Sequence, residues 1–298
     1  MTTDEVFAND AEAVGERRHL IALAFRMLGT IAEAEDVAQE TYARWYRMDH
    51  GEREAIRIPR AWLTRVASRL CLDILASARV RRESYIGPWL PEPVPRGAFV
   101  DTAGGDPLDG VILDDSISTA LLVVLESMTP AERVAFVLHD VFAVPFAEIA
   151  EIVGRSTAAC RQLATSARSR VQRSPVRQVT RREHDEVVLA FAAASRSGDL
   201  HGLIATLDPE VILRSDGGGR VSSARRPVYG SDRVGRFLLG ILQKRPETEL
   251  LEQETNDGLG FALWDQGRII GVVTLEVIAS LTTDVRIVLN PEKLSLWN

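Results

Sequence analysis

The sequence is poor in cysteine and lysine and has no long apolar run. Its 298 residues include two cysteines, Cys71 and Cys160, and two lysines, Lys244 and Lys293, beside thirty-three arginines. Two distant cysteines predict buried, reduced thiols and argue against a metal site or a disulfide framework. No stretch approaches the roughly 20 apolar residues of a membrane span, and the acidic segment 1–18 lacks the blocks of a signal peptide. We therefore expect a cytoplasmic protein.

The sequence also lacks the common catalytic motifs. It contains no GxxxxGKS phosphate loop, no HExxH and no CxxC. His201 and Asp216 are the candidates for a catalytic acid or base in the C-terminal part, but no pair of titratable groups stands at a catalytic spacing. We therefore predict that the protein is not an enzyme and that it holds no cofactor and no metal.

The arginines are concentrated in two stretches of an otherwise acidic chain of net charge −7. Residues 155–182 contain eight arginines and no acid, and residues 57–82 contain seven arginines and one acid. Between them, residues 87–115 contain six acids and one arginine. A basic stripe on an acidic protein indicates a surface that binds phosphate. Hydrophobic content of 46% and charged content of 26% are ordinary for a globular protein of two or three domains.

Segment 145–173 has the pattern of two helices joined by a tight turn, and the second helix is basic. Pro145 suits the first turn of a helix, where an N–H has no partner. Gly154 can take the left-handed conformation that ends this helix, and Ser156 is placed to cap the next one. The face opposite the apolar stripe carries arginine and glutamine, which can form paired hydrogen bonds with purine edges. This outline predicts a DNA-reading helix-turn-helix.

Two further helical groups are predicted. In the first, a helix over 20–28 ends at Gly29, a Thr30/Glu33 capping box starts a helix that reaches about residue 48, and Pro59 opens a third. The polar stretch 49–58 between them is expected to be a loop. In the second group, a helix over 117–128 precedes a capping box at 129–132 and a further short helix.

Residues 84–115 separate these groups and differ from both. The stretch is rich in proline and glycine, shows no helical period, and should be extended to at least Gly105. Its negative charge makes contact with DNA unfavourable and suits a positively charged channel in a partner. A plain solvated tether is the alternative, although the apolar WLP at 89–91 favours docking.

After residue 175 the pattern changes to α+β. Helices are expected over about 183–196 and in the stretch after Gly198, and another over 232–244. Strands are expected at 210–215, 220–225, 248–255, 260–264, 269–278 and 284–289. Helices followed by a strand-rich run predict an α+β domain with a curved antiparallel sheet wrapped around a helix.

With both basic blocks and the linker in view, the chain resembles the extracytoplasmic-function (ECF) sigma factors of the sigma-70 family. AEDVAQETYARWYR (34–47) resembles region 2, residues 58–83 resemble the helix that reads the promoter −10 element, and residues 129–171 resemble region 4, which reads the −35 element. YIGPWLPEPV and the C-terminal block resemble the actinobacterial sigma J type, which carries a fused SnoaL-like domain of the NTF2-like fold. DGGG (216–219) and NPEKL (290–294) are similar to short motifs of such extensions.

The resemblance implies a multidomain fold: two all-α sigma domains, a region 2 bundle and a region 4 helix-turn-helix, plus a C-terminal α+β domain. Region 2 would span 1–83, the acidic linker 84–115, region 4 116–174 and the SnoaL-like regulatory domain 183–298. It implies an alternative sigma factor that binds core RNA polymerase, through the β′ clamp and the β flap, and directs promoter-specific initiation. The fused domain would modulate this activity, and a small ligand of that domain is left open.

The resemblance also assigns residues. Candidates for polymerase binding are Asp36, Gln39, Glu40 and Arg44. Candidates for the −10 element are Arg57, Arg60, Trp62, Arg65, Arg69, Arg79, Arg81 and Arg82. Candidates for the −35 element are Arg155, Ser156, Thr157, Ala158, Arg161, Gln162 and Arg168. Candidates for regulatory contacts are Trp89, Leu90, Pro91, Asn290, Pro291 and Lys293.

Simpler interpretations stand beside these. The residues proposed for polymerase can form a solvated helix face, and Trp62 can be a core residue instead of a base-stacking one. The main alternative for the whole chain is a stand-alone helix-turn-helix regulator with a ligand-sensing domain, which would bind its operator without polymerase.

Overall fold

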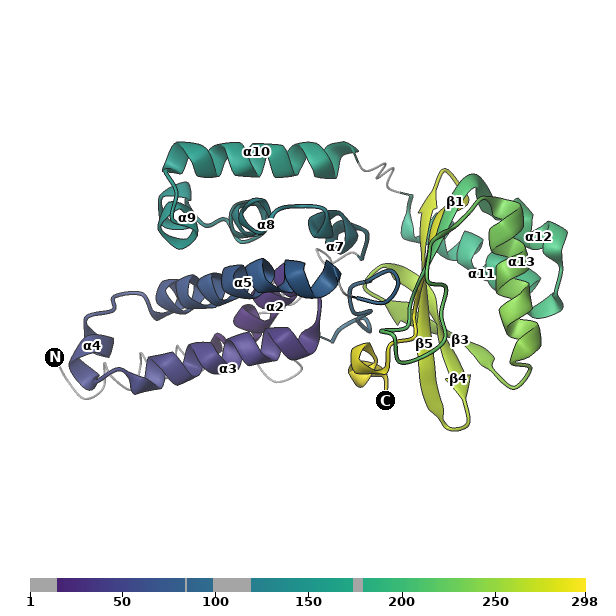
Figure 1. Cartoon of the computed structure of the whole chain (residues 1–298), viewed down its shortest axis with the longest axis horizontal. Coiled ribbons are helices and arrows are strands. Elements are labelled where there is room, and N and C mark those ends of the chain that lie inside the picture. Colours follow the sequence, from purple (N-terminus) through teal and green to yellow (C-terminus); the bar gives the residue numbers. More distant parts are fainter. Residues whose placement is uncertain (1–14, 84, 99–118, 174–178) are drawn as a thin grey trace. The chain divides into compact units, whose positions relative to one another are not determined.

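The computed structural model describes residues 15–83, 85–98, 119–173 and 179–298 (Figure 1). The chain divides into two compact units: residues 1–81 with 124–173, and residues 82–123 with 174–298. The described part of the first unit is helical, and the second unit is α+β, as the sequence predicted. Among the described residues, every helix is too short or too polar to span a bilayer. The acidic residues of segment 99–115 lie outside the described residues.

Three helices in the described part of the first unit lie close to the predicted positions. They are α2 (Arg17–Leu28), α3 (Ile31–Arg47) and α5 (Pro59–Glu83). Gly29 ends α2 with a φ of 82°, as its position predicted. Thr30 precedes α3, but its hydroxyl donates to the Glu33 carboxylate (2.9 Å) and accepts no backbone N–H, so the capping box is incomplete.

The stretch between α3 and α5 is not the loop that we expected throughout. It contains a short helix, α4 (His50–Glu54), which is held by a complete capping box. Glu52 N–H donates to Asp49 Oδ1 (2.8 Å), and Asp49 N–H donates to Glu52 Oε2 (3.0 Å). An apolar periodicity could not reveal this helix, because none of its residues is buried.

The second helical group follows the predicted outline of the helix-turn-helix. It comprises α7 (Thr119–Glu126), α8 (Pro130–Phe136), the π-helical turn η1 (Val137–Val141), α9 (Phe146–Val153) and α10 (Thr157–Arg173). Gly154 ends α9 with a φ of 69°, and Ser156 Oγ accepts the N–H of Ala159 (3.2 Å). Pro145 is the N-cap of α9 and lies just before the helical turn in which we expected it.

The described residues 179–298 of the second unit form three α-helices and one six-stranded sheet. The helices are α11 (Arg181–Ser197), α12 (Leu200–Ala205) and α13 (Ser231–Lys244). The strands are β1 (Leu207–Asp216), β2 (Val228–Tyr229), β3 (Glu249–Thr255), β4 (Gly258–Asp265), β5 (Arg268–Ile278) and β6 (Leu281–Val288), followed by the 3-10 turns η2 (Pro291–Lys293) and η3 (Ser295–Trp297).

The strand order is β2-β1-β6-β5-β4-β3, and every pair except β1–β6 is antiparallel. The sheet is therefore mostly antiparallel, as the sequence predicted, and the parallel β1–β6 pair is its exception. The strand prediction at 220–225 was wrong: that stretch is irregular, with turn and bend residues, and the nearby strand that pairs with β1 is only residues 228–229. Gly217 to Gly219 turn the chain before a ladder can form there.

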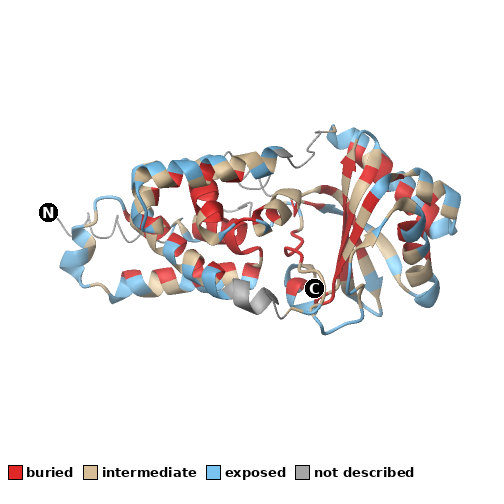
Figure 2. Cartoon of the chain, turned by 45° about the horizontal axis from the view of Figure 1, so that its top comes forward, coloured by how far each residue is buried: buried red, intermediate tan, exposed pale blue. Residues whose placement is uncertain are grey.

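The sheet of the second unit is covered on both faces. Helices α11, α12 and α13 lie on one face (Figure 1), where their apolar sides join the main core of this unit. Successive residues of a strand point to opposite faces, so Val273 belongs to that core while Val272 points away from it. On the far face Val272 packs with Val288, Leu294 and Leu90 of the linker. Figure 2 shows buried residues running the length of the strands.

Candidate nucleic-acid and polymerase interfaces

The candidates for polymerase binding share one face of α3. Asp36, Gln39 and Arg44 are exposed, and Glu40 is half-buried. Arg44 Nε donates to Glu40 Oε1 (2.8 Å), and this hydrogen bond lowers the pKa of Glu40. The opposite side of the helix is buried, because Val37 and Trp45 pack into the core of the unit. The face is therefore accessible and carries a carboxylate that stays charged, as a contact with a basic surface requires.

The candidates for the −10 element lie along α5, except Arg57, which precedes the helix. Arg57 and Arg60 are exposed, and Arg60 Nη2 lies 3.2 Å from Nδ1 of His19. Trp62 is half-buried and packs edge-on against Trp45, with ring centroids 5.4 Å apart. Trp62 thus has the core contact that we weighed against base stacking. Arg79, Arg81 and Arg82 belong to α5, but their side chains lie outside the described residues.

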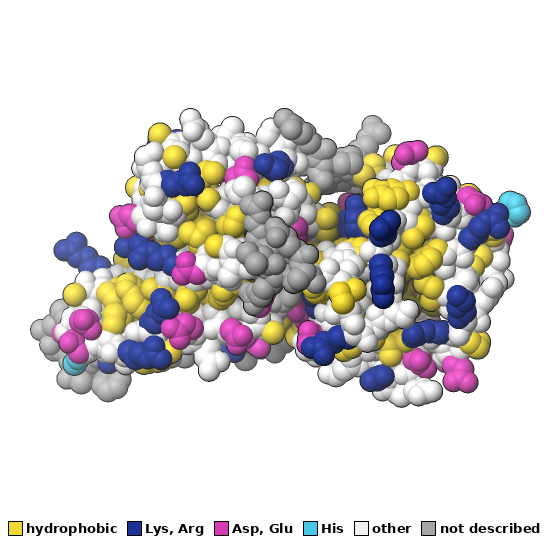
Figure 3. Space-filling model, in the orientation of Figure 1, with side chains coloured by type: hydrophobic (Ala, Val, Ile, Leu, Met, Phe, Trp, Pro, Cys, Tyr) yellow, Lys and Arg dark blue, Asp and Glu magenta, His cyan; other side chains and the backbone are white. Residues whose placement is uncertain are grey.

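Two arginines of α5 are engaged by the first helix of the helix-turn-helix. Arg65 Nη1 lies 3.0 Å from Glu151 Oε2, and Arg69 Nη2 donates to the backbone carbonyl of Glu151 (3.0 Å). On the visible face of the helical unit, acidic and basic side chains are interspersed (Figure 3). Glu151 therefore occupies donor groups of two arginines that we predicted to contact the −10 element.

Six of the −35 candidates form an accessible group, here called the open group, and the seventh, Arg168, is bound in an ion pair. The open group lies at the start of α10: Arg155, Ser156, Ala158, Arg161 and Gln162 are exposed, and Thr157 is half-buried. Buried Cys160, Ala164 and Ala167 hold the other side of the helix against the core. Arg168, two turns further on, is bound by Asp140, with Nε 2.6 Å from Oδ1. The open group presents several donors from one helix end, which is the arrangement that reads a major groove.

The candidates for regulatory contacts are brought together around Asp216, within the second unit. The backbone N–H of Leu90 donates to Asp216 Oδ2 (2.9 Å), and Lys293 Nζ donates to the same oxygen (2.8 Å) and to the carbonyl of Leu90 (2.5 Å). Lys293 also lies 4.0 Å from the ring centroid of Trp89, a cation–π distance. Asp216 is fully buried, and the ammonium group of Lys293 balances the charge of its carboxylate inside the protein. Pro91 is buried as well, and Pro291 lies in η2.

Sequence reasoning missed two members of this cluster. Tyr85 Oη donates to Asp216 Oδ1 (2.6 Å) and accepts from Asn290 Nδ2 (3.2 Å), and burial with the neighbouring carboxylate raises its pKa. Asp216 was named as a catalytic candidate and as the first residue of the DGGG motif, but not as a contact residue. Its position before three glycines was the available signal: Gly218 has a φ of 62°, and a Cβ there would lie 2.5 Å from Asn290. His201, the other catalytic candidate, is exposed on α12.

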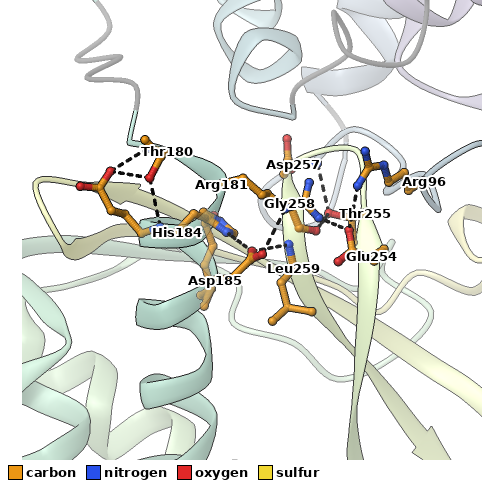
Figure 4. A network of polar contacts seen from close by, with 12 residues as sticks. Arg96, Thr180, Arg181, His184, Asp185, Glu254, Thr255, Asp257, Gly258 and Leu259 are labelled. Atoms are coloured by element: carbon orange, nitrogen blue, oxygen red, sulfur yellow. Dashed lines mark hydrogen bonds and ion pairs between the residues drawn. The ribbon is translucent and has the colours of Figure 1, made fainter. Parts of the chain in front are cut away.

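The linker has a second attachment at the turn between β3 and β4 (Figure 4). Arg96 N–H donates to the Glu254 carbonyl (3.0 Å), and Asn256 N–H donates to the Val94 carbonyl (3.2 Å). The side chains of Arg96 and Arg181 both reach the Glu254 carboxylate. Asp185 supports the turn by accepting the N–H of Leu259 (3.3 Å). Segment 85–98 is therefore fixed to the C-terminal domain at both of its ends.

Comparison with known proteins identifies both helical groups. Sigma-70 region 2 matches residues 15–81, and Sigma-70 region 4 matches residues 118–171. The matches define a two-region sigma protein of the sigma-70 type. The chain is 48% identical over 230 residues to the ECF RNA polymerase sigma factor SigJ of Mycobacterium tuberculosis, covering 76% of this chain and 71% of that protein.

A second relative covers nearly the whole chain. The probable ECF RNA polymerase sigma factor SigI of the same species is 37% identical over 283 residues, 93% of this chain and 92% of that protein. The crystal structure of M. tuberculosis SigJ superposes with a TM-score of 0.74 at 39% identity, covering 96% of this chain and 98% of that one. The chain belongs to the ECF RNA polymerase sigma factors. It acts with RNA polymerase in promoter-directed transcription initiation, which excludes the stand-alone regulator.

Proposed function

We propose that the exposed start of α10 reads the −35 element and that α5 binds the −10 element. The observation that carries this proposal is the pair Arg161 and Gln162 on the exposed face of α10, opposite a buried face, with exposed Arg155 in the turn before the helix. Arg161 and Gln162 have the side chains that pair with guanine and adenine edges. Arg155 lies in the turn before the helix, where a phosphate contact would fix the register.

We further propose that the exposed face of α3 binds the polymerase β′ clamp, and that region 4 also touches the β flap. Support for the first contact is the accessible Glu40–Arg44 pair beside exposed Asp36 and Gln39. The acidic linker, much of it outside the described residues, would occupy a positively charged channel of the polymerase. We assign these functions to four segments: region 2 at 1–83, the linker at 84–115, region 4 at 116–174 and the SnoaL-like domain at 183–298.

An assay of open-complex formation tests the DNA assignments. Purified protein is mixed with core RNA polymerase and promoter DNA, and the variants Arg161→Gln and Arg155→Gln are compared. Arg161→Gln should lose about 1–3 kcal/mol of discrimination at one −35 base pair. Arg155→Gln should weaken binding to all sequences alike and reduce the slope of log affinity against log salt by about one. Unchanged −35 preference in Arg161→Gln would overturn the reading-helix assignment.

A regulatory function of the C-terminal domain is favoured by a separate observation: the Asp216 carboxylate accepts from Tyr85 and from the Leu90 N–H, two groups of the linker. Asp216 Oδ1 also accepts from Gly218, and Lys293 holds Oδ2, so the carboxylate has no lone pair directed at a substrate. We therefore infer that this domain holds the linker and is not catalytic. While the linker is held there, it cannot enter the polymerase.

A further inference from the structure

A cavity of about 400 Å³ lies in the second unit between α11, α13 and the sheet. Its volume falls in the range of small-molecule sites. Most of the wall is apolar and is formed by Phe191, Phe237, Leu238, Leu263, Val273 and Ile287. Among its described lining residues there is no aspartate and no glutamate, and the charged ones are Lys244 and Arg245.

Two hydroxyl groups at the border of this cavity have no partner among the described residues. Ser195 is 5% exposed and its Oγ makes no hydrogen bond, and the buried Oγ1 of Thr248 makes none either. Both residues line the cavity together with Arg245, and all three also line the neighbouring surface hollow. They therefore meet at one end of the cavity, where it approaches solvent. Buried hydroxyls without a partner cost free energy, which a polar group of a ligand would recover.

We propose that this cavity binds a small organic anion with an apolar body, such as a medium-chain carboxylate. The head group accepts hydrogen bonds from Ser195 and Thr248 and pairs with the exposed guanidinium of Arg245. The body lies among the aromatic and aliphatic side chains of the wall. An amine of the same shape would place its positive charge beside Lys244 and Arg245 and is disfavoured.

The cavity shares a wall with the site that holds the linker. Ser222, Ser223 and Ala224 line the cavity, and a Cβ on Gly87 of the linker would meet the backbone of Ala224 and Arg225 at 3.9 and 3.7 Å. Ser215 lines the cavity, and its neighbour Asp216 accepts the Leu90 amide. Ligand and linker therefore contact the same stretch, residues 215–225. A ligand that orders this stretch in its docked conformation stabilises the docked linker; this step rests on the regulatory function proposed above.

Calorimetric titration of the full chain with decanoate, 1-decanol and decylamine tests the site. Decanoate should saturate one site and bind about tenfold more tightly than either neutral or cationic analogue, which corresponds to one charge-assisted contact. Arg245→Gln and Thr248→Val should each weaken decanoate binding. Arg233→Gln, which removes an exposed arginine in the first turn of α13 that does not line the cavity, should not weaken it. Equal affinity for the three probes, or equal loss in Arg245→Gln and Arg233→Gln, overturns the proposal.

Hydrogen exchange of the linker tests the coupling. Saturating decanoate should slow exchange of the Leu90 amide at least about fivefold, the lower end of typical couplings between sites. Unchanged exchange with the site filled overturns the shared-wall argument and leaves the sigma-factor assignments untouched, because those are read from promoter binding.

Discussion

At the scale of single residues, the Asp216–Lys293 pair differs from every exposed ion pair of this unit. Its side chains are 0% and 5% exposed, whereas those of the nearby Arg220–Glu292 pair are 61% and 62% exposed. Removing one partner of a buried pair leaves an uncompensated charge, but removing one of an exposed pair leaves a solvated one. Removing the lysine of the buried pair should therefore lower the free energy of unfolding much more than removing the arginine of the exposed pair.

We expect Lys293→Met to lower the free energy of unfolding by about 3–5 kcal/mol. Arg220→Gln, the matched control, should change it by less than about 1 kcal/mol. Urea denaturation followed by circular dichroism measures both. Similar losses in the two variants would show that the buried pair is not the main anchor of the linker.

His19 makes stability depend on pH in a window that its neighbours set. It lies between Arg60 of α5 (3.2 Å) and Phe142, whose ring centroid is 5.1 Å away. Burial, with the charges of Arg60 and Arg26, lowers the pKa of His19 from 6.5 to about 4. Between these values the unfolded chain binds a proton that the folded protein does not bind. The free energy of unfolding therefore falls as the pH drops from 6.5 towards 4.

We expect this loss to reach about 3 kcal/mol at pH 4, and His19→Gln should remove it because glutamine does not titrate. His50→Gln, at an exposed position on α4, should keep the wild-type profile. Unfolding curves between pH 7 and pH 4 give the comparison. Parallel profiles for wild type and His19→Gln would assign the acid sensitivity to other groups.

At the scale of elements, the periodicity of apolar residues located most helices, since each buries one face. It could not locate α4, which buries nothing, nor β2, which is two residues long. The parallel pairing of β1 with β6 could not be predicted from the sequence either. It joins Leu213 to Val285, far apart in the chain, and local pattern carries no information about which strands become neighbours.

The contact between α5 and α9 predicts a gain of DNA binding on removal of one carboxylate. Glu151→Gln abolishes the ion pair with Arg65, which is 39% exposed, so stability should change by less than about 1 kcal/mol. The released arginine should tighten binding of single-stranded −10 DNA by up to about fivefold, the equivalent of that energy.

The control for this prediction is Glu148→Gln on the same helix, where the carboxylate forms no ion pair with a described residue. Both variants remove one negative charge, so the general electrostatic effect is the same. Fluorescence anisotropy with a labelled oligonucleotide measures the affinities. If the two variants bind equally, Glu151 does not compete with DNA for the arginines of α5.

At the scale of the whole molecule, charge segregation, short motifs and the family resemblance that they support predicted what the chain does, but not which residues hold the linker on the C-terminal domain. The motifs around Trp89 and Lys293 were recognised as contact segments through family resemblance. Their meeting point on Asp216 was not, because an aspartate before glycines is equally typical of an exposed turn. Burial of that carboxylate depends on Tyr85 and Asn290, which lie 205 residues apart.

Release of the linker should raise transcription by the assembled holoenzyme. On the function proposed above, a linker docked on the C-terminal domain is unavailable to polymerase, so weakening the dock should shift the population towards the competent form. Leu90→Asp acts from the linker and Lys293→Met from the domain, and both should raise output in vitro at least about fivefold. Arg220→Gln should leave it unchanged. If exchange of segment 85–98 accelerates in both variants while output stays constant, docking does not control initiation.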